Sequence, residues 1–160
     1  MSWVIFIKTK PIIKPINTSC RTYQNQDLKA ILAIENLAYD FPWSQEKITN
    51  STDNTNALAN VVLVDDQVVG YLLALTCVDF VDILNICIHP KHQHQGLGRQ
   101  LFNHFKHAIN NTATKSIFLE VKRSNDVAIA FYQSLGFESI DTRKKYYSNG
   151  EGAKILRFIL

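Results

Sequence analysis

The chain has 160 residues, of which 46% are hydrophobic and 19% are charged, as is typical of a folded globular protein. This length suits a single domain with an ordinary hydrophobic core. The net charge of +3 is mild, and the lysines and arginines are scattered along the chain, which argues against direct nucleic-acid binding. A mild positive charge still permits anionic ligands.

The three cysteines, Cys20, Cys77 and Cys87, are an odd number without C-x-x-C spacing, and each lies in an apolar segment. We expect buried free thiols in a reducing compartment. The apolar run Trp3–Ile7 is too short to cross a bilayer and lacks the flanking features of a signal peptide. We therefore expect a cytoplasmic monomer that does not bind membranes.

Residues 1–17 form a basic lead-in that is interrupted by prolines and cannot be a helix. Within it, Trp3–Ile7 is expected either to add an edge strand or to belong to a disordered extension. We expect these residues to lie outside a single domain that spans residues 18–160.

Apolar periodicity predicts two helices before the first hairpin. Asp27 and Ser44 are the expected N-caps, and the second helix is expected to run through Ile48. The first helix has an apolar face that consists of Leu28, Ile31, Leu32 and Leu37. Such a face is expected to be buried.

Strands and helices alternate in the second half of the chain. The expected strands are Cys20–Tyr23, Leu58–Val64, Val68–Thr76, Val81–Ile88, Ser116–Val121, Phe137–Tyr147 and Ala153–Leu160. One helix follows Gly98 to about Ile109, and another runs from the N-cap Asn125 to Gly136. This order predicts an α/β fold with helices on both faces of the sheet.

The segment His94–Arg99 joins a predicted strand to a predicted helix and contains Gly96 and Gly98. Glycine permits positive φ and a close approach of the backbone to a ligand. The free N–H groups of a helix start attract anions, so we expect a phosphate here, although a plain tight connection is an equal alternative. Two known phosphate loops do not fit, because the chain lacks Gly-Lys-Ser/Thr and has Leu101 where a third glycine is needed.

The stretch Gln93–Gly98 fits the pattern Gln/Arg-x-x-Gly-x-Gly/Ala and resembles the pyrophosphate loop of the GCN5-related N-acetyltransferases, the GNAT superfamily. Further segments similar to this superfamily are Phe118–Val121, Ser124-Asn125, Ala128–Tyr132 and Ser134–Phe137. Segments similar to the bacterial ribosomal-protein-alanine N-acetyltransferases are Phe41–Ser44, Asn85-Ile86, Leu119–Val121, Arg143 and Tyr146-Tyr147. The resemblance implies the GNAT fold, with a mixed and mostly antiparallel sheet, and acetyl-CoA as cosubstrate.

By this resemblance, backbone N–H groups of the loop would hold the pyrophosphate of coenzyme A. The residues concerned are His94, Gln95, Gly96, Leu97, Gly98 and Arg99. Arg99 would add positive charge. His94 stands where close relatives usually have arginine, and a neutral histidine would weaken one side-chain contact to the phosphate. Backbone groups of Ile86, Cys87 and Ile88 would pair with the pantetheine arm, and one N–H there would hold the thioester oxygen. Asn125 would bond the pantetheine side, cap its helix, or do both.

Glu120 is the candidate base, because a carboxylate is unusual in an apolar strand. An outward-facing residue is the alternative, but alternation puts Glu120 on the same face as Phe118, which favours a partly buried cleft that raises the pKa of Glu120. Tyr132 is the candidate acid by the resemblance, and helical spacing alone equally predicts a core aromatic residue. The tyrosine would hydrogen-bond the departing thiolate.

The resemblance implies that the acceptor is the N-terminal alanine of a small-subunit ribosomal protein. Alternatives are a lysine or small-molecule amine as acceptor, or an acyl-CoA-binding sensor without catalysis. Phe41–Trp43 and Tyr146-Tyr147 are candidate walls for the peptide, and equally candidates for packing. Asp79 and Asp82 would attract a basic peptide, unless they are solvated turn residues. The nearby histidines His89, His92 and His94 lack further ligands at suitable spacing except Cys87, so no metal is expected.

Overall fold

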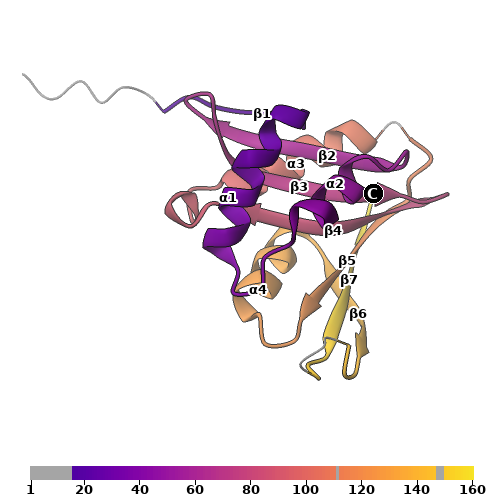
Figure 1. Ribbon diagram of the computed structural model, residues 1–160. Helices are drawn as coiled ribbons and strands as arrows, with labels where there is room; N and C mark the ends of the chain where they lie inside the picture. The colour runs from indigo at the N-terminus through magenta and orange to yellow at the C-terminus, as the bar shows by residue number, and fades with distance from the viewer. Residues whose placement is uncertain (1–15, 111, 147–149) are drawn as a thin grey trace, which may run out of the picture.

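The computed structural model describes residues 16–110, 112–146 and 150–160, and these form one seven-stranded sheet with four α-helices (Figure 1). The strands are β1 (Thr18–Thr22), β2 (Ala57–Val64), β3 (Gln67–Thr76), β4 (Phe80–Ile88), β5 (Ser116–Lys122), β6 (Glu138–Arg143) and β7 (Ala153–Ile159). The α-helices are α1 (Leu28–Ala38), α2 (Gln45–Thr52), α3 (Leu97–Ile109) and α4 (Asp126–Leu135), with 3₁₀ turns η1 (Asn25–Asp27) and η2 (Pro90–His92).

The strand order is β1-β2-β3-β4-β5-β7-β6, and every neighbouring pair is antiparallel except β4 and β5. This arrangement confirms the predicted mixed, mostly antiparallel sheet. Strand β7 lies between β5 and β6, so the last strand in sequence is an inner strand of the sheet.

Two hydrophobic cores cover the two faces of the sheet, because inward-facing residues alternate along the central strands. On β3, Leu72 and Ala74 pack in the core with α3 and α4, whereas Tyr71 and Leu73 pack in the core with α1 and α2. Helix α3 buries a stripe at helical spacing that consists of Leu97, Leu101, Phe102, Phe105 and Ile109. The predicted placement of helices on both faces is therefore confirmed.

The first helix differs from its prediction at both ends. Asp27 does not cap α1 with its side chain, because its carboxylate accepts from the Gln24 N–H at 2.8 Å and binds the Arg21 guanidinium at 2.6 Å. The expected burial of Leu37 is wrong, since this side chain is 61% exposed. The buried residues of α1 are Ile31, Ile34 and Glu35.

Other predicted boundaries shift by a few residues. Ser44 caps α2 as expected, but this helix continues to Thr52, and β6 ends at Arg143. Cys87 is buried and Cys20 is partly buried, whereas the expected burial of Cys77 is wrong because this thiol is exposed. The predictions for Trp3–Ile7 and for residues 147–149 lie outside the described residues.

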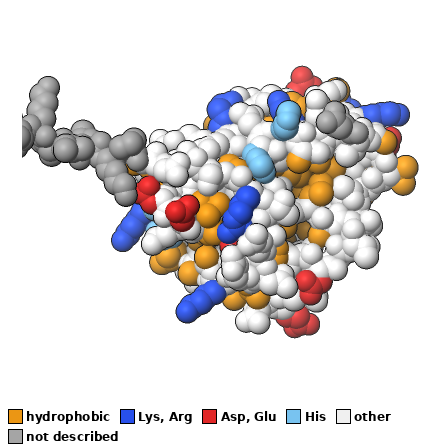
Figure 2. Space-filling view, turned by 90° about the horizontal axis from the view of Figure 1, so that it is seen from above, with side chains coloured by type: hydrophobic (Ala, Val, Ile, Leu, Met, Phe, Trp, Pro, Cys, Tyr) orange, Lys and Arg blue, Asp and Glu red, His pale blue; other side chains and the backbone are white. Residues whose placement is uncertain are grey.

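The surface mixes residue types on the side of the molecule that carries β1. Seen from there, hydrophobic side chains reach the surface in separate patches between charged and polar atoms (Figure 2). In the described part of the chain, no helix combines the length and the apolar character needed to cross a membrane.

Candidate active site

Strands β4 and β5 lie side by side at one end and separate at the other (Figure 1). They pair in parallel over Phe80–Ile83 and Ser116–Leu119. The β3–β4 register shifts between Ile83 and Asn85, so that Leu84 is an extra residue in β4, and such a bulge bends its strand. Beyond it, the described pairings of β4 are with β3 alone. The edge at 85–88 therefore faces an opening in which an extended ligand can add to the sheet.

The connection between β4 and α3 folds into a compact turn. Gln93 donates from its side-chain amide to the Ile88 carbonyl at 3.0 Å. His94 and Gly96 both have positive φ, at 60° and 80°, and this conformation is rare for histidine but free of strain for glycine. The first bond of α3 runs from the Gln100 N–H to the Gly96 carbonyl at 3.0 Å, so the preceding N–H groups of the helix start point toward an incoming anion.

Gly98 sits where the start of α3 approaches α4 most closely. A Cβ atom at this position would lie 3.0 Å from Cζ of Phe131 and 3.8 Å from Cγ1 of Ile88. Arg99 fastens the same two helices, because its guanidinium donates to the Ser134 carbonyl at 3.1 Å and to the Ser134 hydroxyl at 3.0 Å. Gly98 therefore lies in close contact with Phe131 of α4, and the expected role of Arg99 toward phosphate stays a prediction.

Asn125 caps α4, as one of its two expected roles requires. Its side-chain oxygen accepts from the Ala128 N–H at 3.1 Å, and the residue is exposed. The helix ends at Gly136, whose φ of 105° is the expected left-handed C-cap. The contact of Asn125 with pantetheine stays a prediction.

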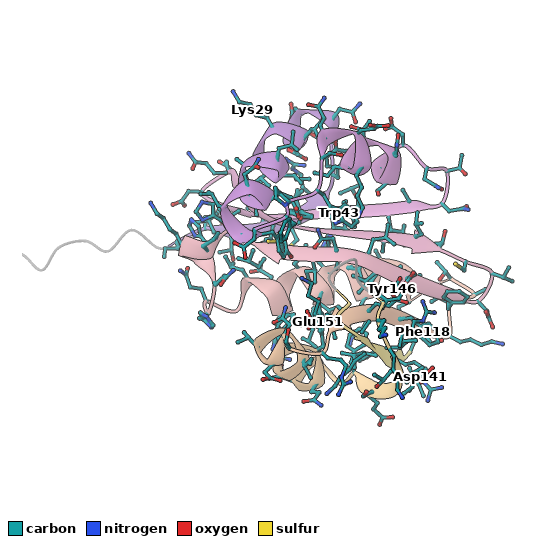
Figure 3. The ribbon with its side chains drawn as sticks, turned by 60° about the horizontal axis from the view of Figure 1, so that its bottom comes forward. Lys29, Trp43, Phe118, Asp141, Tyr146 and Glu151 are labelled. Atoms are coloured by element: carbon teal, nitrogen blue, oxygen red, sulfur yellow. The ribbon has the colours of Figure 1, made fainter. Side chains whose placement is uncertain are left out.

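Glu120 faces a cavity of 570 Å³ between β4, β5 and β6. Its carboxylate is 26% exposed and lies 2.6 Å from the Arg143 guanidinium. Phe118 lines the same cavity, as alternation along β5 predicts, and Figure 3 shows it near Tyr146. The Arg143 guanidinium also lies 5.3 Å from the Tyr146 ring. The predicted base thus occupies a cleft with an arginine partner.

Carboxyl groups give this cavity a negative character. Burial raises the pKa of Asp82, and the nearby charge of Glu120 raises it further. A hydrogen bond to Glu120 raises the pKa of Tyr146. Asp79 and Asp141 also line the cavity, so a positively charged group is its most favourable guest.

Tyr132, the predicted acid, lies on α4 among aromatic residues. Its ring is 5.4 Å from that of Phe131 and 5.7 Å from that of Phe137. Tyr39 lies near enough to interact electrostatically with Tyr132 and with Cys87 on β4, although burial is the main cause that raises the pKa of Tyr39. The structure therefore places Tyr132 with Tyr39 and Cys87, and Glu120 with Arg143 and Asp82.

A buried polar network lies beside β4 and was not predicted from the sequence. The Glu35 carboxylate is completely buried and accepts hydrogen bonds from the Tyr71 hydroxyl, the Asn85 side-chain amide and the Trp43 backbone N–H. A signal existed in the sequence, because Glu35 follows Ile31 by four residues and so shares its buried stripe.

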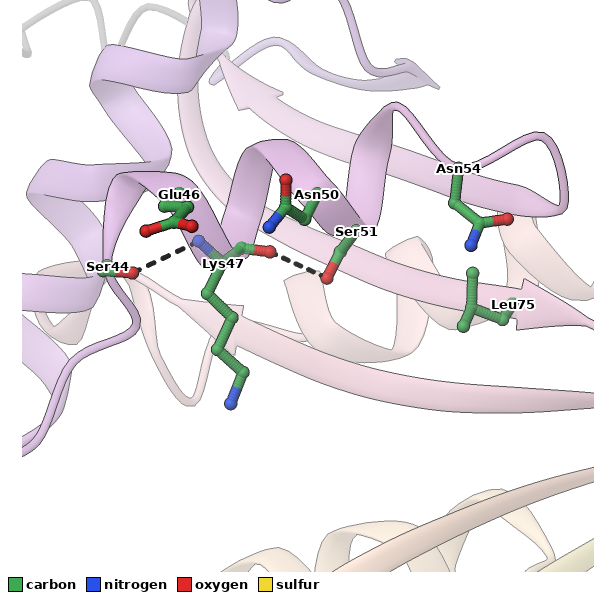
Figure 4. A pocket seen from close by; sticks show the side chains of 7 residues that line it. All are labelled: Ser44, Glu46, Lys47, Asn50, Ser51, Asn54 and Leu75. Atoms are coloured by element: carbon green, nitrogen blue, oxygen red, sulfur yellow. Dashed lines mark hydrogen bonds between the residues drawn. The ribbon is translucent and has the colours of Figure 1, made fainter.

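A metal site and a second pocket were also considered. Within the described ranges, no group of three His, Cys, Asp or Glu side chains is arranged to hold a metal ion. A polar pocket of 380 Å³ along α2 is shown in Figure 4. Its lining residues are Ser44, Glu46, Lys47, Asn50, Ser51, Asn54 and Leu75.

An open strand edge next to an anion-attracting helix start suits an enzyme that holds a phosphate-bearing carrier with an extended arm. Comparison with known proteins defines this class. Residues 28–137 match the family described as acetyltransferase (GNAT) family. A [ribosomal protein bS18]-alanine N-acetyltransferase of Salmonella typhimurium is 34% identical over 79% of this chain and 84% of its own length.

The corresponding Escherichia coli enzyme is 33% identical over 81% of this chain and 86% of its own length. The crystal structure of the ribosomal-protein-S18-alanine N-acetyltransferase from Escherichia coli superposes with a TM-score of 0.83 at 29% identity, covering 89% of this chain and 94% of that one. The chain therefore belongs to the GNAT family and is an N-acetyltransferase. Enzymes of this family use acetyl-CoA.

Proposed function

We propose that this enzyme transfers the acetyl group of acetyl-CoA to the α-amine of a protein N-terminus, namely the N-terminal alanine of ribosomal protein bS18. The observation that carries the proposal is the opening between β4 and β5, which has a phosphate-attracting loop at one end and Glu120 in an acidic cavity at the other. The names and identities of the Salmonella and Escherichia relatives support the choice of acceptor. A ribosomal acceptor implies work in the cytoplasm. We further propose that residues 18–160 form the catalytic domain and that the enzyme acts as a monomer.

Acetyl-CoA supplies the activated thioester, and three segments of the chain would hold it. The helix start at 94–99 would take the pyrophosphate through backbone N–H groups. The open edge at 86–88 would pair with the pantetheine arm and present an N–H to the thioester oxygen, whose negative charge grows during attack. Asn125 would bond the arm from the other side with the amide nitrogen that its cap does not use.

Glu120 would accept the proton of the attacking amine, directly or through a water molecule. A peptide α-amine has a reference pKa of about 8, against about 10.4 for lysine, so roughly a tenth of it is neutral at pH 7. A base of modest strength is therefore sufficient for an N-terminal acceptor. The negative charge of the cavity would attract the protonated amine before it reacts.

Tyr132 would donate a hydrogen bond to the sulfur of the departing thiolate. A phenol has a pKa of about 10 and a thiol one of about 8.5, a mismatch of roughly 2 kcal/mol for complete proton transfer. The proton would therefore move late, and the hydrogen bond is the main contribution. Around the acceptor, Phe41 is 90% exposed and Tyr146 is 45% exposed, so both offer apolar surface to an entering peptide.

Mass spectrometry tests the proposal. A bS18-derived peptide that begins with alanine is incubated with the enzyme and acetyl-CoA, and an α-blocked version that contains lysine serves as control. We expect one acetyl group on the free peptide and none on the control. Acetylation of the control would show that the acceptor is a lysine side chain. If neither peptide is acetylated, the proposed acceptor is wrong.

A further inference from the structure

The carboxylate of Glu35 is buried in an unusual way. It is inaccessible to solvent, and among the described residues no lysine or arginine forms an ion pair with it. Burial raises the pKa of Glu35, while hydrogen bonds from Trp43 and Asn85 act in the opposite direction. An unpaired buried carboxyl group is costly unless its hydrogen bonds are made, so an ordinary apolar core would not contain it.

The partners of Glu35 come from three separate segments. Tyr71 belongs to β3 and Asn85 to β4, whereas Trp43 belongs to the connection between α1 and α2. The Trp43 N–H donates to Oε2 of Glu35 at 2.7 Å, and Nδ2 of Asn85 donates to Oε1 at 2.8 Å. One carboxylate therefore fastens the α1–α2 connection to the strand that is predicted to hold the thioester.

The network extends from Glu35 to the surface through Asn85 and Tyr39. The Tyr39 hydroxyl donates to Oδ1 of Asn85 at 3.2 Å. Burial is the main cause that raises the pKa of Cys87 to about 12, and the nearby Tyr39 side chain has a smaller, opposite effect. Tyr39 remains 40% exposed, so part of this residue is accessible to a ligand.

We propose that Glu35 is a positioning residue for the acceptor: through Trp43 and Asn85 it holds the segment 39–44, and with it the ring of Tyr39, against β4 beside Cys87. The ring of Tyr39 then forms a wall that the acceptor peptide contacts as it approaches the thioester. This inference rests on the proposed transfer to a peptide amine and adds a determinant of acceptor binding.

Glu35→Gln tests the positioning, because glutamine keeps the shape but its amide nitrogen donates and cannot accept, so that one end of the side chain loses the hydrogen bonds that Glu35 accepts there. We expect amide hydrogen exchange in residues 39–44 to accelerate about tenfold or more, while α3 keeps its protection. We expect KM for the acceptor peptide to rise about tenfold and KM for acetyl-CoA to stay within about twofold. Unchanged exchange in residues 39–44, or equal increases in both KM values, would overturn the proposal.

Tyr39→Phe keeps the ring but removes the hydroxyl that bonds Asn85, so the ring is no longer held against β4, and folding is not in question because this side chain is partly exposed. We expect KM for the acceptor to rise about fivefold with an unchanged melting temperature. Tyr23→Phe is the matched control, because it also removes a tyrosine hydroxyl, one that interacts with Thr52 on α2, and it should leave the acceptor KM unchanged. An acceptor KM that is equal in Tyr39→Phe and the native enzyme would contradict the positioning of the Tyr39 ring through Asn85. If the native enzyme acetylates no peptide, the proposed function fails. The positioning role of Glu35 is then tested by the hydrogen exchange of residues 39–44 alone.

Discussion

The Arg143 guanidinium on β6 reaches across β7 and lies 2.6 Å from the Glu120 carboxylate on β5. The two strands are not neighbours, so this ion pair spans the width of one strand. On the intervening strand β7, Ala153 lies opposite Arg143 and Ile155 lies opposite Glu120, so the ion pair crosses β7 diagonally. The sheet order thereby places an arginine beside the candidate base.

Arg143→Gln should reduce kcat/KM about tenfold, because the Glu120 carboxylate loses the partner that fixes its orientation. The pair is half-exposed on the arginine side, so the melting temperature should change little. Steady-state kinetics and thermal unfolding measure the two effects. Lys144→Gln removes the same charge from the next residue and should leave kcat/KM unchanged. A similar loss in both variants would indicate general electrostatics instead of orientation.

Glu120→Gln should lose most activity at low pH, where removal of the amine proton is hardest. The pH dependence of kcat/KM between about pH 6 and pH 9 measures this effect, because the free α-amine titrates near pH 8. At high pH the amine is already neutral, and the variant should approach the native rate. A variant whose pH–rate profile has the native shape would remove Glu120 from the role of base.

Tyr132→Phe should lower kcat more than it changes either KM. Phenylalanine keeps the ring contacts with Phe131 and Phe137, so the fold should be retained while the proposed hydrogen bond to the sulfur is lost. A decrease of about 10²-fold is expected for a lost acid. The melting temperature is the control measurement. A normal kcat would leave Tyr132 with the alternative role of a core aromatic residue.

Local patterns predicted the elements that depend on neighbouring residues in sequence. Asn125 caps α4, Gly136 ends it, and Gly96 has the positive φ expected for its loop. Each of these features depends on a few successive residues, so that the sequence contains the necessary information.

Features that depend on distant residues were not predictable in this way. The insertion of β7 between β5 and β6 is a matter of strand pairing, which periodicity does not specify. The bulge at Leu84 results from the register with β3, and it opens the site. Helical spacing places Glu35 on the buried stripe of α1, but it does not identify the partners Tyr71 and Asn85, which lie 36 and 50 positions away.

Asp27→Asn should destabilise the protein by about 3 kcal/mol at pH 7, because it leaves a buried side chain without its charged bond to Arg21. The hydrogen bonds from Arg21 lower the pKa of Asp27 in the folded state. A lowered pKa stabilises the fold above the ordinary aspartate pKa, and this contribution is lost as the pH falls through the folded value. The difference between variant and native protein should therefore shrink below about pH 4.

Urea unfolding at neutral and acidic pH measures the Asp27 effect. Asp66→Asn, in the exposed turn between β2 and β3, is the matched control and should change stability at neither pH. A stability difference for Asp27→Asn that is the same at both pH values would show that packing, and not the ion pair, accounts for it.

Gly98→Ala should weaken both the fold and the binding of acetyl-CoA. The new methyl group would lie 3.0 Å from Cζ and 3.3 Å from Cε2 of Phe131, so the Phe131 ring must shift by a few tenths of an ångström. Overpacking of this kind costs about 1–3 kcal/mol. Because the same turn of α3 presents the N–H groups of the phosphate site, KM for acetyl-CoA should rise more than KM for the acceptor.

A double-mutant cycle separates this clash from other effects of the methyl group. Phe131→Leu removes the ring atoms that the new methyl group meets, so it should restore part of the stability and of the acetyl-CoA KM in the Gly98→Ala background. Strict additivity of the two substitutions would contradict the contact. Gly96→Ala is the comparison within the same loop: with φ at 80° and no heavy atom within 4 Å of a new Cβ, it should be strained by its backbone alone. Its stability loss should therefore not respond to Phe131→Leu.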